Sequence, residues 1–384
     1  MIKDTAALRE FCETCAQHPF VTIDTEFHRE RTYYSQLCLI QIAFPGMGDE
    51  NAVLVDALSP DLDLEPLYDL FRNTDVVKVF HAARQDLEIF FVQAGLFPEP
   101  FFDTQVAAMV CGFGEQVGYE TLVRKICKAS LDKSSRFTDW KQRPLTQKQQ
   151  TYALADVTHL RDIYLYLKEE LEKTGRQSWL VEELGVLLSP ETYTIEPKEA
   201  WRRIKTRNTS RPFLAIVREL AMVREDLARS KDVPRNRIIK DDALLEIAGS
   251  KPKDVHALGK SRLLMRDARK GDLADALLAA IAKGVKCKPE DHPEPAIHAP
   301  KKPGNEGLAE LLRVLLKAKA EQAGVAQKLI ATTSDLDLLA SDARDGAASL
   351  KGWRYEVFGQ DALRLMAGEV ALAANGSHVK IVEI

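Results

Sequence analysis

The sequence predicts an α/β domain built on a mixed sheet, followed by two all-α domains. Strand-like and helix-like patterns alternate over the first 174 residues, whereas helical patterns dominate from residue 211 onward. A proline-rich segment at residues 286–303 divides the helical part in two. Alternating strands and helices are typical of a sheet covered by helices. A length of 384 residues is enough for three such domains.

We therefore expect an α/β domain at residues 1–174, a connecting segment at 175–210 and a first helical domain at 211–285. A proline-rich linker at 286–303 and a second helical domain at 304–384 complete the chain. An ungapped shift of 92 residues pairs Leu220 with Leu312 and Ile238 with Ile330. This offset predicts that the two helical domains are diverged copies of one unit.

The strands of the first domain are predicted from short apolar or alternating runs bounded by turn residues. They lie at residues 20–23, 34–44, 52–55, 76–80 and 101–102. Helices are expected at residues 84–94, 104–110 and 147–173. Thr146 and Gln149 form a capping-box pattern at the start of the last helix, and Asp103 is expected to cap the helix at 104–110.

The composition excludes several classes of protein. The net charge is −4, with 45% hydrophobic and 29% charged residues, which is ordinary for a soluble globular chain. The sequence has no run of 18 apolar residues and no apolar leader after Met1, so we expect a cytoplasmic protein without membrane helices. Cys12 and Cys15 form a single CxxC without partners for a zinc site, which favours reduced thiols.

Four carboxylates and a tyrosine stand out by their positions. Asp24 and Glu26 are two residues apart at the end of an apolar strand, so they share one face and would repel each other without a cation between them. Asp86 falls in the first turn of the helix that follows the strand at 76–80. Tyr152 and Asp156 are four residues apart on one helix face.

Each of these features also has an ordinary structural interpretation. Asp24 and Glu26 could lie on a solvent face, and Asp86 in a first helical turn favours the helix dipole. Tyr152 could pack in a core beside a solvated Asp156. The functional interpretation depends on the three segments taken together. His81 and His159 lack further ligands near them in sequence, so zinc is not expected.

In this order, the segments Ile23–Phe27, His81–Asp86 and Tyr152–Asp156 resemble the three motifs of DEDD-superfamily 3′–5′ exonucleases of the tyrosine type. The run Thr138–Thr146 ahead of the third motif is similar to ribonuclease D, and the helical tail resembles paired HRDC domains. The resemblance implies a ribonuclease-H-like core in which Asp24, Glu26, Asp86 and Asp156 bind two divalent ions, Mg²⁺ or Mn²⁺. Tyr152 would orient the attacking water, because a phenol with an ordinary pKa of about 10 is a poor base at neutral pH.

Basic residues with interleaved aromatics predict contacts with single-stranded RNA. The candidates are Arg136, Trp140, Lys141 and Arg143 ahead of the third motif, and Arg202 and Arg203 near the first helical domain. A core position for Trp140 is the alternative. Lys351, Trp353, Arg354 and Tyr355 form a smaller patch in the second helical domain.

The resemblance implies a monomeric 3′–5′ exoribonuclease that trims structured RNA precursors, notably tRNA, and releases nucleoside 5′-monophosphates. Two alternatives stay open. A DNA-directed exonuclease would need the same carboxylates, although the sequence has no P-loop of a fused helicase. A non-catalytic RNA-binding protein on the same fold would usually have lost one of the four carboxylates, and all four are present.

Overall fold

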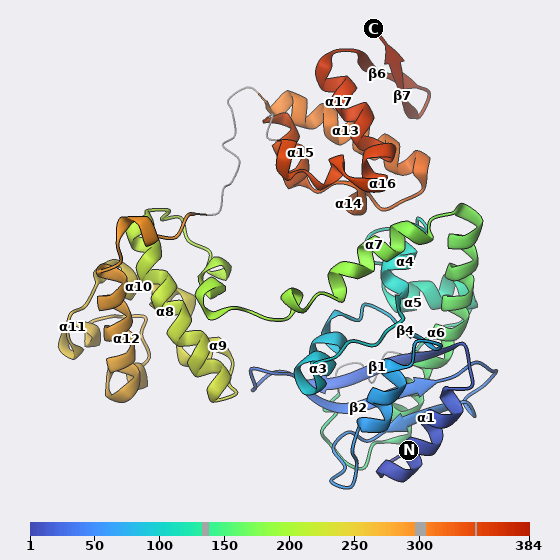
Figure 1. Cartoon of the computed structure of the whole chain (residues 1–384), viewed down its shortest axis with the longest axis horizontal. Coiled ribbons are helices and arrows are strands. Elements are labelled where there is room, and N and C mark those ends of the chain that lie inside the picture. Colours follow the sequence, from blue (N-terminus) through green and yellow to red (C-terminus); the bar gives the residue numbers. More distant parts are fainter. Residues whose placement is uncertain (133–137, 296–304, 342–343) are drawn as a thin grey trace.

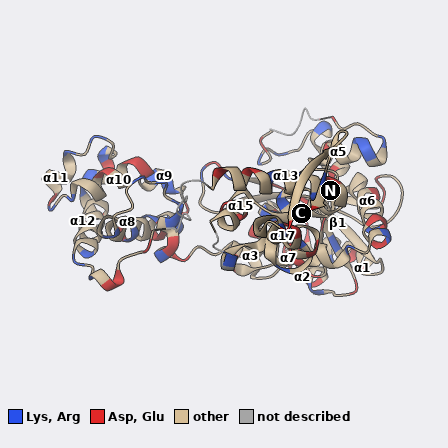
Figure 2. Ribbon diagram, turned by 90° about the horizontal axis from the view of Figure 1, so that it is seen from above, with Lys and Arg blue, Asp and Glu red and all other residues tan. Residues whose placement is uncertain are grey.

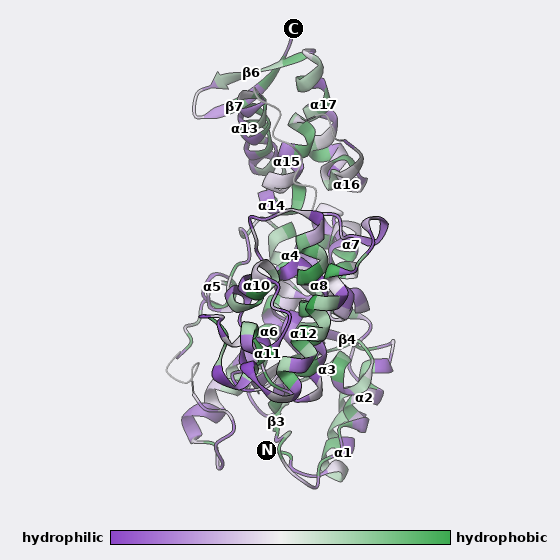
Figure 3. Ribbon diagram, turned by 90° about the vertical axis from the view of Figure 1, so that its left-hand side faces the viewer, coloured by the Kyte–Doolittle hydropathy of each residue, from purple (hydrophilic) through white to green (hydrophobic). Residues whose placement is uncertain are grey.

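A computed structural model describes residues 1–132, 138–295, 305–341 and 344–384 of the chain (Figure 1). It contains an N-terminal α/β part and two helix-rich parts, each with its own group of buried hydrophobic residues. Hydrophobic side chains are concentrated on packed helices such as α8 and α12, while purple hydrophilic segments lie at the periphery (Figure 3). No helix in the described ranges is both long and apolar enough to cross a membrane.

The predicted mixed sheet is confirmed, and its five strands run in the order β3-β2-β1-β4-β5. Strand β1 pairs antiparallel with β2 and parallel with β4, while β2–β3 is antiparallel and β4–β5 is parallel. The strands are β1 Phe20–His28, β2 Gln36–Ala43, β3 Ala52–Val55, β4 Val77–Phe80 and β5 Phe101–Asp103.

Strand β1 is longer than its apolar run indicated. Its pairing with β2 continues through Glu26 opposite Leu39 to His28 opposite Gln36, with a register shift between Glu26 and Phe27. Asp24 and Glu26 therefore lie within the paired strand, which continues past them to His28. Hydrogen bonding to a neighbouring strand fixes their backbone, which sequence alternation alone could not indicate.

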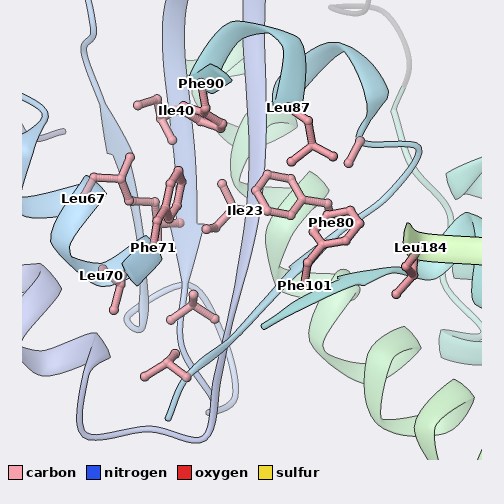
Figure 4. Packing of buried hydrophobic residues seen from close by; sticks show 14 of the residues in the cluster. Ile23, Ile40, Leu67, Leu70, Phe71, Phe80, Leu87, Phe90, Phe101 and Leu184 are labelled. Atoms are coloured by element: carbon pink, nitrogen blue, oxygen red, sulfur yellow. The ribbon is translucent and has the colours of Figure 1, made fainter. Parts of the chain in front are cut away.

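The two faces of β1 serve different purposes. Val21 and Ile23 are fully buried in the main core, where Ile23 lies among Phe71, Phe80 and other large side chains (Figure 4). On the opposite face Phe20 packs with Leu160 and Tyr164 of α6. Thr22 shares that second face, because side chains alternate along a strand.

The helices of the α/β part have the bounds α1 Thr5–Cys15, α2 Glu65–Arg72, α3 Arg84–Ala94, α4 Thr104–Val110, α5 Tyr119–Leu122, α6 Gln147–Thr174 and α7 Gln177–Leu187. The capping box at the start of α6 is present, since the Thr146 side chain accepts from the Gln149 backbone and the Gln149 side chain accepts from the Thr146 backbone. Asp103 caps α4 as expected. Cys12 and Cys15 are buried and free.

Two helix-rich parts follow. The first comprises α8 Arg211–Ser230, α9 Arg235–Ile238, α10 Asp241–Ser250, α11 Val255–Gly259 and α12 Gly271–Val285. The second comprises α13 Glu306–Ala323, α14 Gln327–Ile330, α15 Thr333–Ala340, α16 Gly352–Arg354 and α17 Gln360–Ala367. A shift of 92 residues carries α9 onto α14, and the first residue of α10 onto the first residue of α15.

The expectation that the second helical domain is all-α is wrong at its C-terminal end. Strands β6 Val370–Asn375 and β7 His378–Glu383 form an antiparallel hairpin. The physical reason lies in the turn, where Gly376 and Ser377 form the two-residue loop between the paired residues Asn375 and His378, and Gly376 adopts a positive φ of 62°. Alternating apolar residues on either side then pair across the hairpin, in place of the long helix α12 of the first copy.

The second helical part contacts the α/β part through α7. The rings of Trp179 and Trp353 stack with their centroids 4.4 Å apart, and Arg354 pairs with Glu182 and Glu183. Two members of the small basic-aromatic patch predicted at residues 351–355 are therefore engaged inside the molecule. Trp353 is only 6% exposed.

The crossing of α8 and α12 depends on a glycine. A Cβ at Gly284 would lie 2.6 Å from the Ile216 Cα, which is backbone and cannot rotate away. We expect Gly284→Ala to lower the stability of the first helical domain by about 1–3 kcal/mol, as overpacking does. Gly249→Ala in α10 is the matched control, because nothing lies within 4 Å of its Cβ. The control should be neutral or slightly stabilising, and equal melting temperatures for the two variants would contradict this account.

Candidate active site

Strand β1 and helix α6 bring three predicted carboxylates together. One oxygen each of Asp24, Glu26 and Asp156 lies within 4.8 Å of the others, and no further acidic, His or Cys residue of the described chain joins them in this group. The Thr22 hydroxyl donates to the Val157 carbonyl over 2.8 Å, which ties the helix to the strand one residue beyond Asp156. Residues 130 positions apart in sequence thus form one acidic centre.

Asp86 lies beside this centre but outside the group of three. It is in the first turn of α3, is 6% exposed, and accepts a hydrogen bond from the Thr25 hydroxyl. Thr25 alternates with Asp24 and Glu26 along β1, so Asp86 reaches the strand from the Thr25 side. It is nevertheless close enough for its charge to raise the pKa of Asp24 and of Glu26.

Burial and neighbouring carboxylates both raise the pKa values of Asp24 and Glu26 in this centre. Burial, followed by the charges of Asp156 and Asp86, raises the pKa of Glu26 to about 9. Burial also raises the pKa of Asp86 to about 7, although the hydrogen bond from Thr25 opposes this. The pKa of Asp24 is well above its ordinary value for the same reasons, burial first and Asp156 next.

Oxygen donors at this spacing fit a hard divalent cation. Mg²⁺ and Mn²⁺ prefer carboxylate oxygens and water, and a cation would remove the repulsion that raises these pKa values. Asp24, Glu26 and Asp156 could hold one ion, and Asp86 stands beside Asp24 for a second. A cluster of this kind also suits phosphate chemistry, in which charge develops on oxygens.

A cavity of about 350 Å³ opens at the carboxylates. Asp24, Tyr152 and Asp156 line it, so the predicted tyrosine and two of the acids face the same space. The Tyr152 ring lies 6.2 Å from that of Trp140, which supports it from behind. A molecule in the cavity would touch the phenol and the acidic centre together.

Sequence reasoning missed other residues that line this cavity, among them His81, Gln105 and Tyr119. The His81 Nδ1 lies 3.0 Å from the Thr104 hydroxyl, and burial lowers the pKa of this imidazole. Tyr119 donates to the Ala155 carbonyl over 2.9 Å. His81 stands in the second motif and was considered only as a zinc ligand, while Gln105 and Tyr119 have no sequence pattern that marks them.

Two of the residues predicted to contact RNA, Trp140 and Arg143, make their contacts within the protein. Trp140 is 4% exposed and packs with Leu39 and Leu145, so its ring is not open to a base in this structure. Arg143 pairs with both carboxylate oxygens of Asp56, at 2.9 and 2.6 Å, and also donates to the Cys38 carbonyl. Trp140 therefore lies in the core, which is the alternative to a contact with RNA.

The remaining candidates differ in their exposure. Lys141 is half-buried, and Arg202 and Arg203 are exposed. Arg202 pairs with Glu199 and lies over the Trp201 ring, 5.0 Å from its centroid. Arg136 lies outside the described residues. Arg202 and Arg203 thus present cations at the surface between the α/β part and the first helical part.

Comparison with protein families gives two matches. Residues 1–172 match the model of a 3′-5′ exonuclease domain, which contains all four carboxylates and Tyr152. Residues 213–282 match the model of the HRDC domain, which corresponds to the first helical part.

Comparison with curated proteins and solved structures gives full-length relatives. The chain is 61% identical to a ribonuclease D of Jannaschia sp. (strain CCS1), over 100% of this chain and 99% of that protein. It is 46% identical to a ribonuclease D of Granulibacter bethesdensis, over 99% and 95% of the two chains. The crystal structure of Escherichia coli RNase D, an exoribonuclease involved in structured RNA processing, matches with a TM-score of 0.83 at 29% identity, covering 96% of this chain and 98% of that one.

The acidic centre predicts how stability depends on pH and metal. Because Glu26 has a pKa of about 9 in the folded protein and about 4.3 when unfolded, the folded state holds more protons between these values. Raising the pH from about 5 to 9 should therefore lower the melting temperature of the metal-free protein. Mg²⁺ or Mn²⁺ should raise it, most strongly at the alkaline end. A melting temperature that neither cation changes at any pH would contradict the metal assignment, and Asp156→Asn should reduce the response.

The Arg143–Asp56 pair predicts a second effect on stability. Burial raises the pKa of Asp56, but the hydrogen bonds and charge of Arg143 outweigh it and hold the pKa below its ordinary value. Arg143→Met should cost roughly 3 kcal/mol at pH 7, because it leaves a buried carboxylate unpaired. The pair stabilises above pH about 3.9 and is lost as pH falls through the lowered pKa, so the difference from wild type should shrink in acid.

The exposed pair Lys148–Asp132, 3.6 Å apart, provides the control for this measurement. Lys148→Met removes a cation from the same segment and should change stability by less than about 1 kcal/mol. Chemical denaturation of both variants at pH 7 and pH 3.5 makes the comparison. Equal losses in the two variants would show that Arg143 is not a structural clamp.

Proposed function

Since the chain belongs to the ribonuclease D family and is therefore a 3′-5′ exoribonuclease, we propose that it trims the unpaired 3′ ends of structured RNA precursors, tRNA precursors foremost. The carboxylate centre of Asp24, Glu26 and Asp156, with Tyr152 facing the same cavity, is the observation that carries the proposal. We also propose that the protein is cytoplasmic and monomeric. The solved Escherichia coli relative is described as acting in structured RNA processing, which supports this substrate class.

The residues present fit two divalent metal ions, Mg²⁺ or Mn²⁺. Asp24, Glu26 and Asp156 would hold the first, and Asp24 with Asp86 the second. When bound, the ions would acidify the attacking water and stabilise charge on the attacking and leaving oxygens. For its part in the second site, Asp86 would exchange its hydrogen bond from Thr25 for a share in metal binding.

The chain's own residues then position the reaction. Tyr152 lines the same cavity as Asp24 and Asp156, so its hydroxyl would orient the water for attack on the terminal phosphodiester. A new P–O bond forms to the water oxygen, the bond to the 3′ oxygen of the preceding nucleotide breaks, and that oxygen leaves as a 3′-hydroxyl. A nucleoside 5′-monophosphate and an RNA shorter by one residue are the products.

The second helical part is proposed to be a second HRDC-like domain at residues 304–384 with a modified C-terminus. The correspondence of α9 with α14 at an offset of 92 residues supports this proposal. The domain boundaries at 174, 210, 285 and 303 stay as proposed from the sequence. Lys141, Arg202 and Arg203 are the described candidates for RNA contact, because their side chains are half-buried or exposed.

A DNA-directed exonuclease would use the same centre, since metal chemistry on a phosphate needs no 2′-hydroxyl. The discriminating measurement is the degradation of matched RNA and DNA oligonucleotides by the wild-type protein. RNA preference is expected. Equal rates on RNA and DNA would instead indicate an exonuclease that degrades any single-stranded nucleic acid.

A time course on a tRNA with a short 3′ extension tests the site itself. Asp24→Asn and Asp156→Asn should lose nearly all activity, and Tyr152→Phe should lose about 100-fold in kcat, as expected for a misplaced nucleophile. EDTA should stop the wild-type reaction, and Mg²⁺ or Mn²⁺ should restore it. Activity of either aspartate variant near that of wild type would contradict the proposed centre.

A further inference from the structure

The α/β part and the first helical part meet at a tyrosine in the loop between β1 and β2. The Tyr33 hydroxyl accepts from Arg235 over 2.8 Å and from Arg229 over 3.1 Å, and it donates to Glu225. The Arg235 guanidinium also lies 4.6 Å from the Tyr33 ring centroid. The backbone amides of Tyr33 and its neighbour donate to the Asp232 carboxylate. This loop is thus fixed against α8 and α9.

Two cavities flank Tyr33, of about 500 Å³ and 290 Å³. Both are lined by Arg29 and Arg203 as well as by Tyr33 and Arg235, so they adjoin one another along the seam. Ribbon segments coloured for lysine and arginine gather near α9 (Figure 2). The basic residues that line the two cavities are Arg29, Arg203, Arg224, Arg229, Arg235 and Lys240, against the acids Glu88 and Asp241.

Several of these cations have donors left over after their protein contacts. Arg224 is 4% exposed and pairs with Asp241 over 2.5 Å, yet its buried Nε has no hydrogen-bond partner in the described structure. An unsatisfied buried guanidinium nitrogen is costly unless something binds it. Arg203 and Lys240 are exposed, and neither has an ion-pair partner among the described residues. The larger cavity therefore combines net positive charge with unused N–H donors, which suits an anion.

The seam begins close to the acidic centre along the chain. Arg29 follows β1 by one residue and lies three residues beyond Glu26, about 10 Å of extended chain. It also pairs over 3.1 Å with Glu88, two residues past Asp86 on α3. An RNA strand whose 3′ end occupies the carboxylate cavity can thus extend its backbone toward this seam.

From these contacts we infer that the arginine-lined seam between the β1–β2 loop and α8–α10 binds backbone phosphates of the RNA strand upstream of the bond being cleaved. The inference rests on the proposed exoribonuclease function and adds the place where the body of the substrate is held. Phosphate oxygens would accept from the free Arg224 Nε and pair with Arg203 and Lys240. No base edge is read, so binding is independent of sequence.

The test measures binding in the full-length Asp24→Asn background, so that RNA is bound and not degraded. Arg203→Ser with Lys240→Ser removes two exposed cations from the seam. Lys253→Ser with Lys260→Ser, also exposed and in the first helical domain, removes the same charge away from the cavities of the seam. Fluorescence anisotropy over a salt series, with a 5′-labelled single-stranded RNA 12-mer and a trinucleotide, reports affinity and its salt dependence.

For the seam variant we expect about a tenfold loss of affinity for the 12-mer and a salt slope smaller by roughly 1.4, the value for two lost single-strand phosphate contacts. The trinucleotide, which has fewer phosphates to place along the seam, should lose less, and the control variant should keep the original slope for both. A 12-mer bound by the seam variant as tightly and with the same slope as by the control would overturn the inference. Failure of wild-type protein to degrade the 12-mer would instead count against the proposed function.

Discussion

The mutual repulsion of carboxylates drawn from β1 and α6 is the constraint on which the rest of the active domain depends. Like charges at this separation resist folding unless the surrounding structure holds them. The Thr22–Val157 hydrogen bond and the packing of Phe20 on α6 hold them from one side. The ion pair of Arg143 with Asp56 holds the segment before α6 from the other. These stabilising contacts hold in place the carboxylates, whose mutual repulsion destabilises the metal-free fold.

The sequence was sufficient for the five strands of the sheet, for the starts of α3, α4 and α6 and for the residues of the acidic centre, but α1, α2, α5 and α7 were not predicted. Strong local signals explain this, such as the capping box of Thr146 and Gln149 and the alternation that places Asp24 and Glu26 on one face. Asp86 could be assigned to a first turn, but its hydrogen bond from Thr25 depends on how α3 meets β1. Contacts between distant segments have no counterpart in local pattern.

Prediction failed where one residue type has two uses. Trp140 and Arg143 carry the chemistry of RNA binding, and only the tertiary structure shows that the indole is buried and the guanidinium is committed to Asp56. The hairpin at the C-terminus was missed for a different reason, because a short apolar run is compatible with helix or strand. The two-residue turn of Gly376 and Ser377 decides between them, and its signal was in the sequence.

The clamp at Arg143 has a consequence for how the protein responds to its ionic surroundings. The Arg143 guanidinium is held by the Asp56 carboxylate and by the Cys38 and Trp140 carbonyls, and partly buried ion pairs are screened by salt less than exposed charges. The helix that carries Tyr152 and Asp156 therefore keeps its place at ionic strengths that strip RNA from surface cations. Salt concentration becomes a means of separating capture of the strand from cleavage of its last bond in a single protein.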